Sequence, residues 1–199
     1  GVDAFAMGTV RLDGGAGRQG NGLFASKSDG SPEDSQGKIG GAVKFRLSDT
    51  ELKYGNQFVA SPVFSTDDSR LLPEVATGTL ITSKEIKGLE LNAGRFTALS
   101  SQTGMARDSI NGKGKPGLTA ANIAGATYQF TDNFVGGIAA SDVDDYFKKQ
   151  YINLNYTLPI AESQALNFDF NGYRTSSQGQ ELAGDVDNKI WSLAAAYSL

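Results

Sequence analysis

The feature that most restricts the folds open to this chain is an alternation of apolar and polar residues, repeated in many segments of roughly ten residues. A period of two places successive side chains on opposite faces of a β-strand, whereas a helix repeats every 3.6 residues. No segment has a convincing helical period. The pattern predicts an all-β fold of about ten strands, near residues 2–12, 38–48, 51–58, 77–86, 89–99, 118–130, 133–142, 147–158, 165–174 and 188–199.

The links between these segments alternate in length along the chain. Short, turn-like links lie at 47–51, 86–89, 130–134 and 159–163. Long, polar links rich in Gly, Ser and Asp lie at 13–37, 59–76, 100–117 and 175–187, and one compact link at 142–145 departs from the rule. Outer-membrane barrels have long loops outside and short turns in the periplasm. The alternation therefore favours a transmembrane antiparallel up-and-down β-barrel over a soluble all-β domain.

Composition excludes several classes of chemistry. The 199 residues contain 25 Gly and 7 Tyr but no Cys and no His, which removes zinc clusters, Cys or His nucleophile pairs and thiol redox chemistry. We therefore expect no enzyme, no catalytic residue, no metal site and no cofactor. The formal charge is -4, and the 18 basic residues form no long patch. Nucleic acid is not an expected partner.

A helical membrane protein is also excluded, because no apolar run approaches the ~20 residues that a spanning helix needs. Residues 1–12 lack the charged start and apolar centre of a signal peptide. If the protein is exported, its signal has been removed or lies outside this sequence. The mean hydropathy of -0.28 is compatible with a barrel, whose strands mix apolar and polar residues.

Residue parity predicts which face of each strand is wet. In 38–48, Ile39, Val43, Phe45 and Leu47 share one face, and the other face holds Lys38, Ala42, Lys44 and Arg46. Segments 147–158 and 165–174 repeat the separation, with Asn and Thr prominent on the polar side. We expect the apolar faces to contact lipid and the polar faces to line the lumen.

Two strands leave the interpretation open. Trp191 and Tyr197 are spaced to approach two interfacial aromatic girdles, yet aromatic residues in a sandwich core explain the same strand equally well. Arg95 shares the parity of Leu91 and Ala93, so either it lies above the lipid or a bulge near Gly94 returns it to the lumen.

Residues 53–83 resemble the third-loop region of the OprD family of substrate-specific outer-membrane porins. The resemblance is strongest in the run that begins with Pro62-Val63-Phe64 and ends with Ser69-Arg70-Leu71-Leu72-Pro73. Further similar segments are 2–5, 40–44, 88–91, 155–159, 168–171, 173–175 and 191–197, so the resemblance extends over nearly the whole chain.

The resemblance implies a Gram-negative outer-membrane channel with an 18-stranded barrel. It implies a monomer or a loose homotrimer, surrounded by outer-membrane lipid and lipopolysaccharide. Residues 1–199 would form a single partial β-barrel domain with an inward constriction loop near 59–76. The sequence begins inside the barrel and stops after Leu199 without a terminal aromatic strand, so we expect further strands before and after it. An open sheet would otherwise leave two unpaired edges in lipid.

Members of the family take up small water-soluble solutes that bear a carboxylate, such as amino acids and aromatic or other organic acids. A row of cations lowers the energy of a carboxylate without a large desolvation cost, and here the candidates for this basic wall are Lys38, Lys44, Arg46 and Lys53. Alternatively, these cations merely hydrate the lumen wall.

The expected constriction residues of the inward loop are Asp67, Asp68, Ser69 and Arg70, with Pro62 and Pro73 stiffening its ends. Arg70 has the alternative role of pairing with Asp68 or the wall to hold the loop down. Asp169 and Tyr173 are candidates for an opposite wall that meets an ammonium group. Segments 13–17 and 142–145 lack the ligand spacing of a calcium loop.

Two other functions stay open at this stage. One is an outer-membrane barrel with a structural or adhesive role and no transport. The other is a soluble carbohydrate-binding β-sandwich. The sequence does not choose between basic amino acids and aromatic or other carboxylates as the preferred solute.

Overall fold

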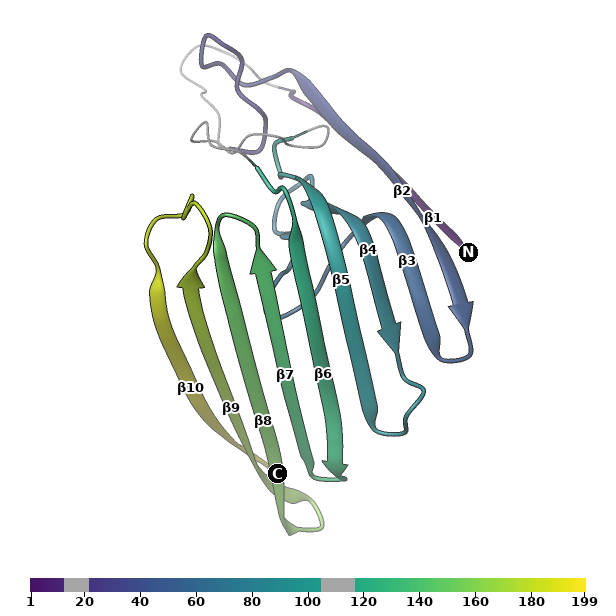
Figure 1. Ribbon diagram of the computed structural model, residues 1–199, viewed down its shortest axis with the longest axis vertical. Coiled ribbons are helices and arrows are strands. Elements are labelled where there is room, and N and C mark those ends of the chain that lie inside the picture. The colour runs from purple at the N-terminus through teal and green to yellow at the C-terminus, as the bar shows by residue number, and fades with distance from the viewer. Residues whose placement is uncertain (13–21, 105–116) are drawn as a thin grey trace.

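The computed structural model describes residues 1–12, 22–104 and 117–199. In this part of the chain ten strands form one antiparallel sheet, in which each strand pairs with the next along the chain (Figure 1). The strands are β1 (Val2–Val10), β2 (Ser35–Leu47), β3 (Thr50–Gln57), β4 (Val75–Ser83), β5 (Leu89–Ser100), β6 (Ala121–Thr131), β7 (Phe134–Val143), β8 (Phe147–Ala161), β9 (Gln164–Ser177) and β10 (Asp187–Ser198). The sheet is open, with β1 and β10 at its two edges.

The predicted all-β, up-and-down architecture is confirmed. Each of the ten predicted segments coincides with one strand, and the bounds differ by up to three residues, as at the start of β2 (Ser35) and the end of β4 (Ser83). That end of β2 pairs with the end of β1, Ser35 with Val10, so pairing extends the strand into a polar stretch that alternation alone does not reveal. The described residues include no helix long and apolar enough to cross a membrane.

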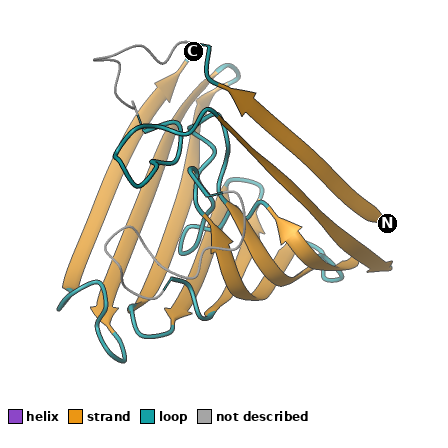
Figure 2. Ribbon diagram, turned by 90° about the horizontal axis from the view of Figure 1, so that it is seen from above, coloured by secondary structure: helices purple, strands orange, loops and turns teal. Residues whose placement is uncertain are grey.

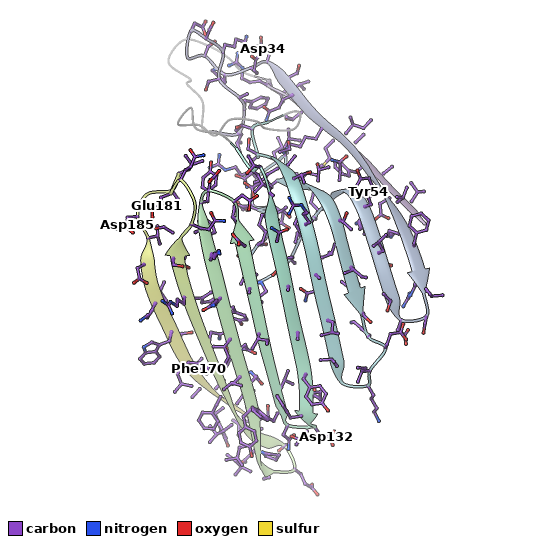
Figure 3. All side chains as sticks on the ribbon, viewed as in Figure 1. Asp34, Tyr54, Asp132, Phe170, Glu181 and Asp185 are labelled. Atoms are coloured by element: carbon purple, nitrogen blue, oxygen red, sulfur yellow. The ribbon has the colours of Figure 1, made fainter. Side chains whose placement is uncertain are left out.

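The short and long links lie at opposite ends of the sheet (Figure 1). The short links connect β2 to β3, β4 to β5, β6 to β7 and β8 to β9, while the other connections gather at the far end. Figure 3 shows Asp132 in a short link at one end and Glu181 and Asp185 in the last long link at the other. Parts of two predicted long links, 13–21 and 105–116, lie outside the described residues, and so does segment 13–17.

Two short links are tied together by one carboxylate. Glu85 accepts hydrogen bonds from the Ser48 hydroxyl, the Asp49 backbone N–H and the Thr50 hydroxyl, at 2.9, 2.9 and 3.0 Å. The Ser48 and Thr50 hydroxyls lower the pKa of Glu85. Ser48 takes a positive φ of 53° at the turn, so this bonding stabilises a conformation that residues other than Gly adopt rarely.

Strand register sorts the side chains onto two faces. The outer face carries exposed apolar residues from edge to edge, including Ile39 (84% exposed), Leu47 (83%) and Trp191 (71%). The other face is concave, and the loop segments of the long-link end lie within its curve (Figure 2). We call it the lumen face. The parity assignments made for β2, β8 and β9 agree with this register.

The buried core lies between the lumen face and the segment 58–74. Val59, Phe96, Ile123 and Val143 belong to one buried cluster, together with Ala76 and Ala121. Phe64 of the segment stacks on Phe96, with ring centroids 5.1 Å apart and planes 14° from parallel. An apolar contact therefore holds this segment against the inside of the sheet.

Arg95 lies on the outer face of the sheet, so no bulge near Gly94 returns it to the lumen. Its register partners are Thr79 and Asn122, and its guanidinium donates to Asn122 Oδ1 at 2.8 Å. A register shift does occur in β5, but it lies beyond Arg95, between the pairs that contain Phe96 and Ala98. The irregularity therefore leaves Arg95 on the same face as Leu91.

We predict that Gly55→Ala destabilises the sheet. Gly55 has a φ of +130°, and a Cβ there would collide with the carbonyl oxygen of Gly41 and lie 2.7 Å from Ala42 Cα. Backbone strain and overpacking together should cost about 2 kcal/mol or more. The control is Gly8→Ala in β1, where a Cβ meets nothing within 4 Å. Thermal unfolding in detergent, followed by far-UV circular dichroism, should show a lower midpoint for Gly55→Ala alone; equal midpoints would contradict the packing argument.

Candidate functional site

The four predicted basic-wall residues lie on the lumen face of two neighbouring strands. Lys38, Lys44 and Arg46 alternate along β2, and Lys53 of β3 stands directly opposite Lys44. From Lys38 to Arg46 the row extends about 27 Å along the strand. Their role in solute binding stays a prediction, but register brings their side chains to one surface.

The middle of this row is partly neutralised by an acid that sequence reasoning missed. Asp3 of β1 forms ion pairs with Lys44 Nζ and Lys53 Nζ, each at 2.8 Å. Like charges directly opposite in a sheet repel, so Asp3 stabilises the Lys44 and Lys53 pair. The three groups together carry one net positive charge. Only the register of β1 on β2 shows this arrangement, because Asp3 and Lys53 are far apart in sequence.

The two ends of the row have different surroundings. Lys38 is 5% exposed, and its Nζ donates to the carbonyl oxygens of Pro73 at 2.6 Å, of Ser100 at 3.5 Å and of Ser101. Arg46 is exposed near the short links, where its Nε donates to the Ser48 carbonyl at 3.3 Å. Lys38 is thus an anchor between the wall and two loop segments, while Arg46 is accessible to solvent.

The segment 58–74 holds its own shape by hydrogen bonds. Asp67 and Glu74 are joined twice: the Glu74 N–H donates to the Asp67 carbonyl at 2.7 Å, and the Asp67 N–H donates to Glu74 Oε2 at 3.0 Å. Asp67 Oδ1 also accepts the Ser69 N–H at 2.8 Å, which lowers the pKa of Asp67. The Ser69 hydroxyl accepts a long bond of 3.4 Å from Gln102.

Arg70 fixes the tip of the segment, although by a different contact from those expected. Its guanidinium donates to the carbonyl oxygen of Gly22, while Asp68 is exposed. In the part of the segment between Pro62 and Pro73, Val63 (2% exposed) and Leu72 (1%) are buried, Phe64 stacks on Phe96, and Leu71 is exposed. The Ser141 hydroxyl of β7 donates to the Val63 carbonyl at 3.1 Å. Whether the segment constricts a pore stays a prediction.

Asp169 and Tyr173 lie on the lumen face of β9, within a network of amides. Asp169 accepts from Asn153 at 2.8 Å, from Asn155 at 3.0 Å and from Asn171 at 2.5 Å. Tyr173 packs against Tyr151, with ring centroids 4.6 Å apart. The amide groups solvate the carboxylate, so it can remain charged against the wall of the sheet.

A hollow on the lumen face combines aromatic rings with a cation that sequence reasoning also missed. It has a volume of about 740 Å³ and is lined by Phe64, Leu118, Tyr146, Phe147 and Lys149, among others. Lys149 Nζ lies 5.4 Å from the centroid of the Phe147 ring, within the range of a cation–π contact. The alternation of β8 contained the signal, since Phe147 and Lys149 share the parity of Tyr151 and Asn153.

Lys149 differs from the other cations of the lumen face. Lys38, Lys44, Arg46 and Lys53 all have carboxylate or carbonyl partners. Within residues 1–12, 22–104 and 117–199, Lys149 forms no ion pair or hydrogen bond. Its charge is therefore available to an anion in the hollow. The same residues include no group of three acidic side chains that could hold a metal ion.

The comparisons with known proteins agree with this geometry. The chain matches the family described as outer membrane porin, OprD family, over residues 1–199. This chain belongs to the OprD family. It is 41% identical to Porin D of Pseudomonas aeruginosa, covering 100% of this chain and 45% of that protein. It is 29% identical to the porin-like protein GalP of Pseudomonas putida, covering 96% of this chain and 47% of that protein.

Solved structures of OprD-family porins have the same fold. A BenF-like porin from Pseudomonas fluorescens Pf-5 superposes with a TM-score of 0.87 at 33% identity, covering 98% of this chain and 51% of that one. OpdK of Pseudomonas aeruginosa, solved with vanillate, gives a TM-score of 0.83 at 28% identity, covering 98% and 54%. The chain spans about half the length of these relatives.

Family membership confirms two expectations. OprD-family porins such as Porin D are outer-membrane proteins, so the location of this chain is the bacterial outer membrane. The relatives are porins and not enzymes. The exposed apolar outer face of the sheet is accordingly the face toward lipid.

We predict that Lys38→Met loosens both loop segments that Lys38 anchors. The change removes the charge and leaves the partly buried carbonyl oxygens of Pro73 and Ser100 without this donor, which costs roughly 1 kcal/mol each. Hydrogen exchange should speed up in residues 58–74 and 100–104 while β8 and β9 stay protected. Lys44→Met is the control, because the partner of Lys44 is a side chain of β1; equal exchange in the two variants would contradict the anchor role.

Proposed function

We propose that the lumen face lines a channel for the selective diffusion of small water-soluble solutes that bear a carboxylate. The observation that carries the proposal is Lys149, a lumen cation whose charge is free among the described residues and which borders an aromatic hollow. The trio of Asp3, Lys44 and Lys53 adds one net positive charge to the same lumen face, on the strands β1 to β3.

In this proposal, charge binds the carboxylate of the solute and apolar packing binds the rest of it. A carboxylate about 4 Å from Lys149 gains roughly 1 kcal/mol in watery surroundings and up to about 4 kcal/mol at an effective dielectric of 20. The rings of Phe64 and Phe147 provide a surface for the apolar part of a solute. Such binding is strong enough to attract a solute and weak enough to release it, as diffusion through a channel requires.

The segment 58–74 is the proposed constriction. It lies against the lumen face through Val63 and Phe64 and borders the same hollow as Lys149. A solute that crosses the channel would therefore meet Lys149 where the path is narrow and the dielectric is lowest. Asp67 and Asp68 on this segment, opposite a basic wall, would orient a dipolar solute.

The amide network of β8 and β9 is the proposed contact for the remainder of the solute. Asp169 supplies a negative charge for an ammonium group, and the amides of Asn153 and Asn171 supply donors and acceptors. Tyr173 supplies an aromatic face. The proposal thus includes amino acids as well as aromatic and other organic acids. It is supported by the solved OpdK structure, whose ligand, vanillate, is an aromatic carboxylate. A monomer or loose homotrimer is the proposed assembly.

Lys149→Gln should slow the entry of an organic anion without slowing a neutral solute. Loss of about 1 kcal/mol corresponds to a decrease of about fivefold at low salt. The measurement is the swelling of proteoliposomes in gluconate and in glucose, which have similar sizes. In 1 M salt the difference should shrink, because the screening length falls to about 3 Å. Lys87→Gln, a change in a short link at the far end of β5, is the control, and equal slowing of both solutes by Lys149→Gln would mean a changed pore shape.

The trio around Asp3 should give effects of opposite sign. Asp3→Asn raises the net charge of the trio from one to two, and Lys44→Gln lowers it to zero. We expect faster gluconate entry for the first variant and slower entry for the second, each by a few fold at low salt. Glucose entry should not change. If both variants slow gluconate, the trio acts on the shape of the wall and its charge does not attract the solute.

A further inference from the structure

The outer face of β8, β9 and β10 carries a polar layer close to the long-link end. Gln150 of β8 pairs with Arg174 of β9, and Arg174 pairs with Lys189 of β10. All three residues are exposed. Arg174 is the one exposed residue of β9, whose other residues are partly buried. These three side chains share the parity of Ile152 and Trp191, so they point away from the lumen. We call them the cationic layer.

The cationic layer lies directly beside the apolar band of the outer face. The next layers toward the short-link end consist of Ile152, Gly172 and Trp191, and then of Leu154, Phe170 and Leu193. Figure 3 shows Phe170 between the two ends of the sheet. Successive layers are about 6.8 Å apart. Because long links of outer-membrane barrels face outside, the cationic layer lies at the border of the outer leaflet, at the depth of lipid headgroups.

The charges in this layer lack an acidic partner in the described part of the chain. Arg174 and Lys189 are directly opposite each other, an arrangement that is destabilising for like charges. Neither forms an ion pair with a described residue. Asp142, on the same face, is engaged by Lys148 at 3.3 Å, and Asp187 lies one layer farther toward the long links, opposite Ser176. An external anion would therefore relieve the repulsion.

We propose that Arg174 and Lys189, together with Gln150, bind a phosphate group of lipopolysaccharide in the outer leaflet. The guanidinium of Arg174 offers two parallel donors that match phosphate oxygens, and Lys189 adds a compact charge. The Gln150 amide adds a neutral donor. In the apolar layer below, the side chains of Ile152 and Phe170 cover Gly172, where a Cβ would meet them at 3.1 and 3.5 Å, and an acyl chain of the same lipid would lie on this surface beside Trp191.

This site is separate from the solute path. Its side chains occupy the outer face, whereas Lys149 and Asp169 occupy the lumen face. Lipid binding and solute diffusion can therefore be tested independently, and failure of one does not imply failure of the other. The site concerns how the protein is held in its membrane.

The test uses the affinity of the purified protein, in micelles of a nonionic detergent, for diphosphorylated lipid A. Trp191 is the single tryptophan of these 199 residues and stands one layer from Lys189, so the emission change that is lost in a Trp191→Phe variant reports binding. The double variant Arg174→Gln with Lys189→Gln should lose about tenfold or more in affinity, the loss expected for removing charged hydrogen bonds. The charge-preserving variant Arg174→Lys with Lys189→Arg keeps most of the affinity and shows that the sheet still folds.

Matched controls separate this site from general charge effects. Lys84→Gln with Lys87→Gln removes the same charge at the short-link end and should leave the affinity unchanged. Lipid A without phosphates should bind the native protein about as weakly as intact lipid A binds the double variant. Native affinity for intact lipid A in the double variant, equal binding of the dephosphorylated lipid, or an equal loss in the control variant would each overturn the proposal. Displacement of lipid A by millimolar inorganic phosphate would overturn the lipid assignment in favour of a free-anion site.

Discussion

The continuous hydrogen-bonded register of the ten strands is the constraint on which the other features of this protein depend. In lipid, backbone N–H and C=O groups have no water to bind, so each strand must pair with its neighbours. Once the pairing is fixed, the period of two decides the face of every side chain, and a slip of one residue would exchange the faces. The register Lys44 to Lys53 and Lys53 to Leu80 thus fixes the wall that a solute would meet.

The two faces solve different physical problems. The outer face exposes apolar side chains such as Ile39, Phe45 and Trp191, because lipid requires no polar partner. The lumen face has to hold charges and amides close together, and it does so by pairing them. Asp3 offsets two lysines, and three asparagines solvate Asp169. Lys38 shows the same rule for a buried charge, which the carbonyl oxygens of Pro73, Ser100 and Ser101 stabilise.

The segment 58–74 gives the lumen face its apolar contacts. A sheet with a polar inner face has little apolar surface of its own to bury, and Phe64 on Phe96 and Val63 under Ser141 supply it at one level. The loop is therefore both part of the core and the border of the hollow beside Lys149. In the proposed function, packing and solute recognition depend on the same residues.

The sequence by itself determined the strands, the ends at which the links lie and the face of most side chains, because alternation and turn residues are local signals. It placed Lys38, Lys44, Arg46 and Lys53 on one wall, Asp169 and Tyr173 on another, and the run 62–73 in a special loop. The tertiary structure alone decided the charge state of that wall and the availability of each cation. Asp3 reaches Lys53, Lys38 reaches Pro73, and Arg70 reaches Gly22 across long separations in sequence. Such contacts depend on strand register and on the path of the loops. Both result from many weak interactions over the whole sheet, so no local sequence pattern encodes these contacts.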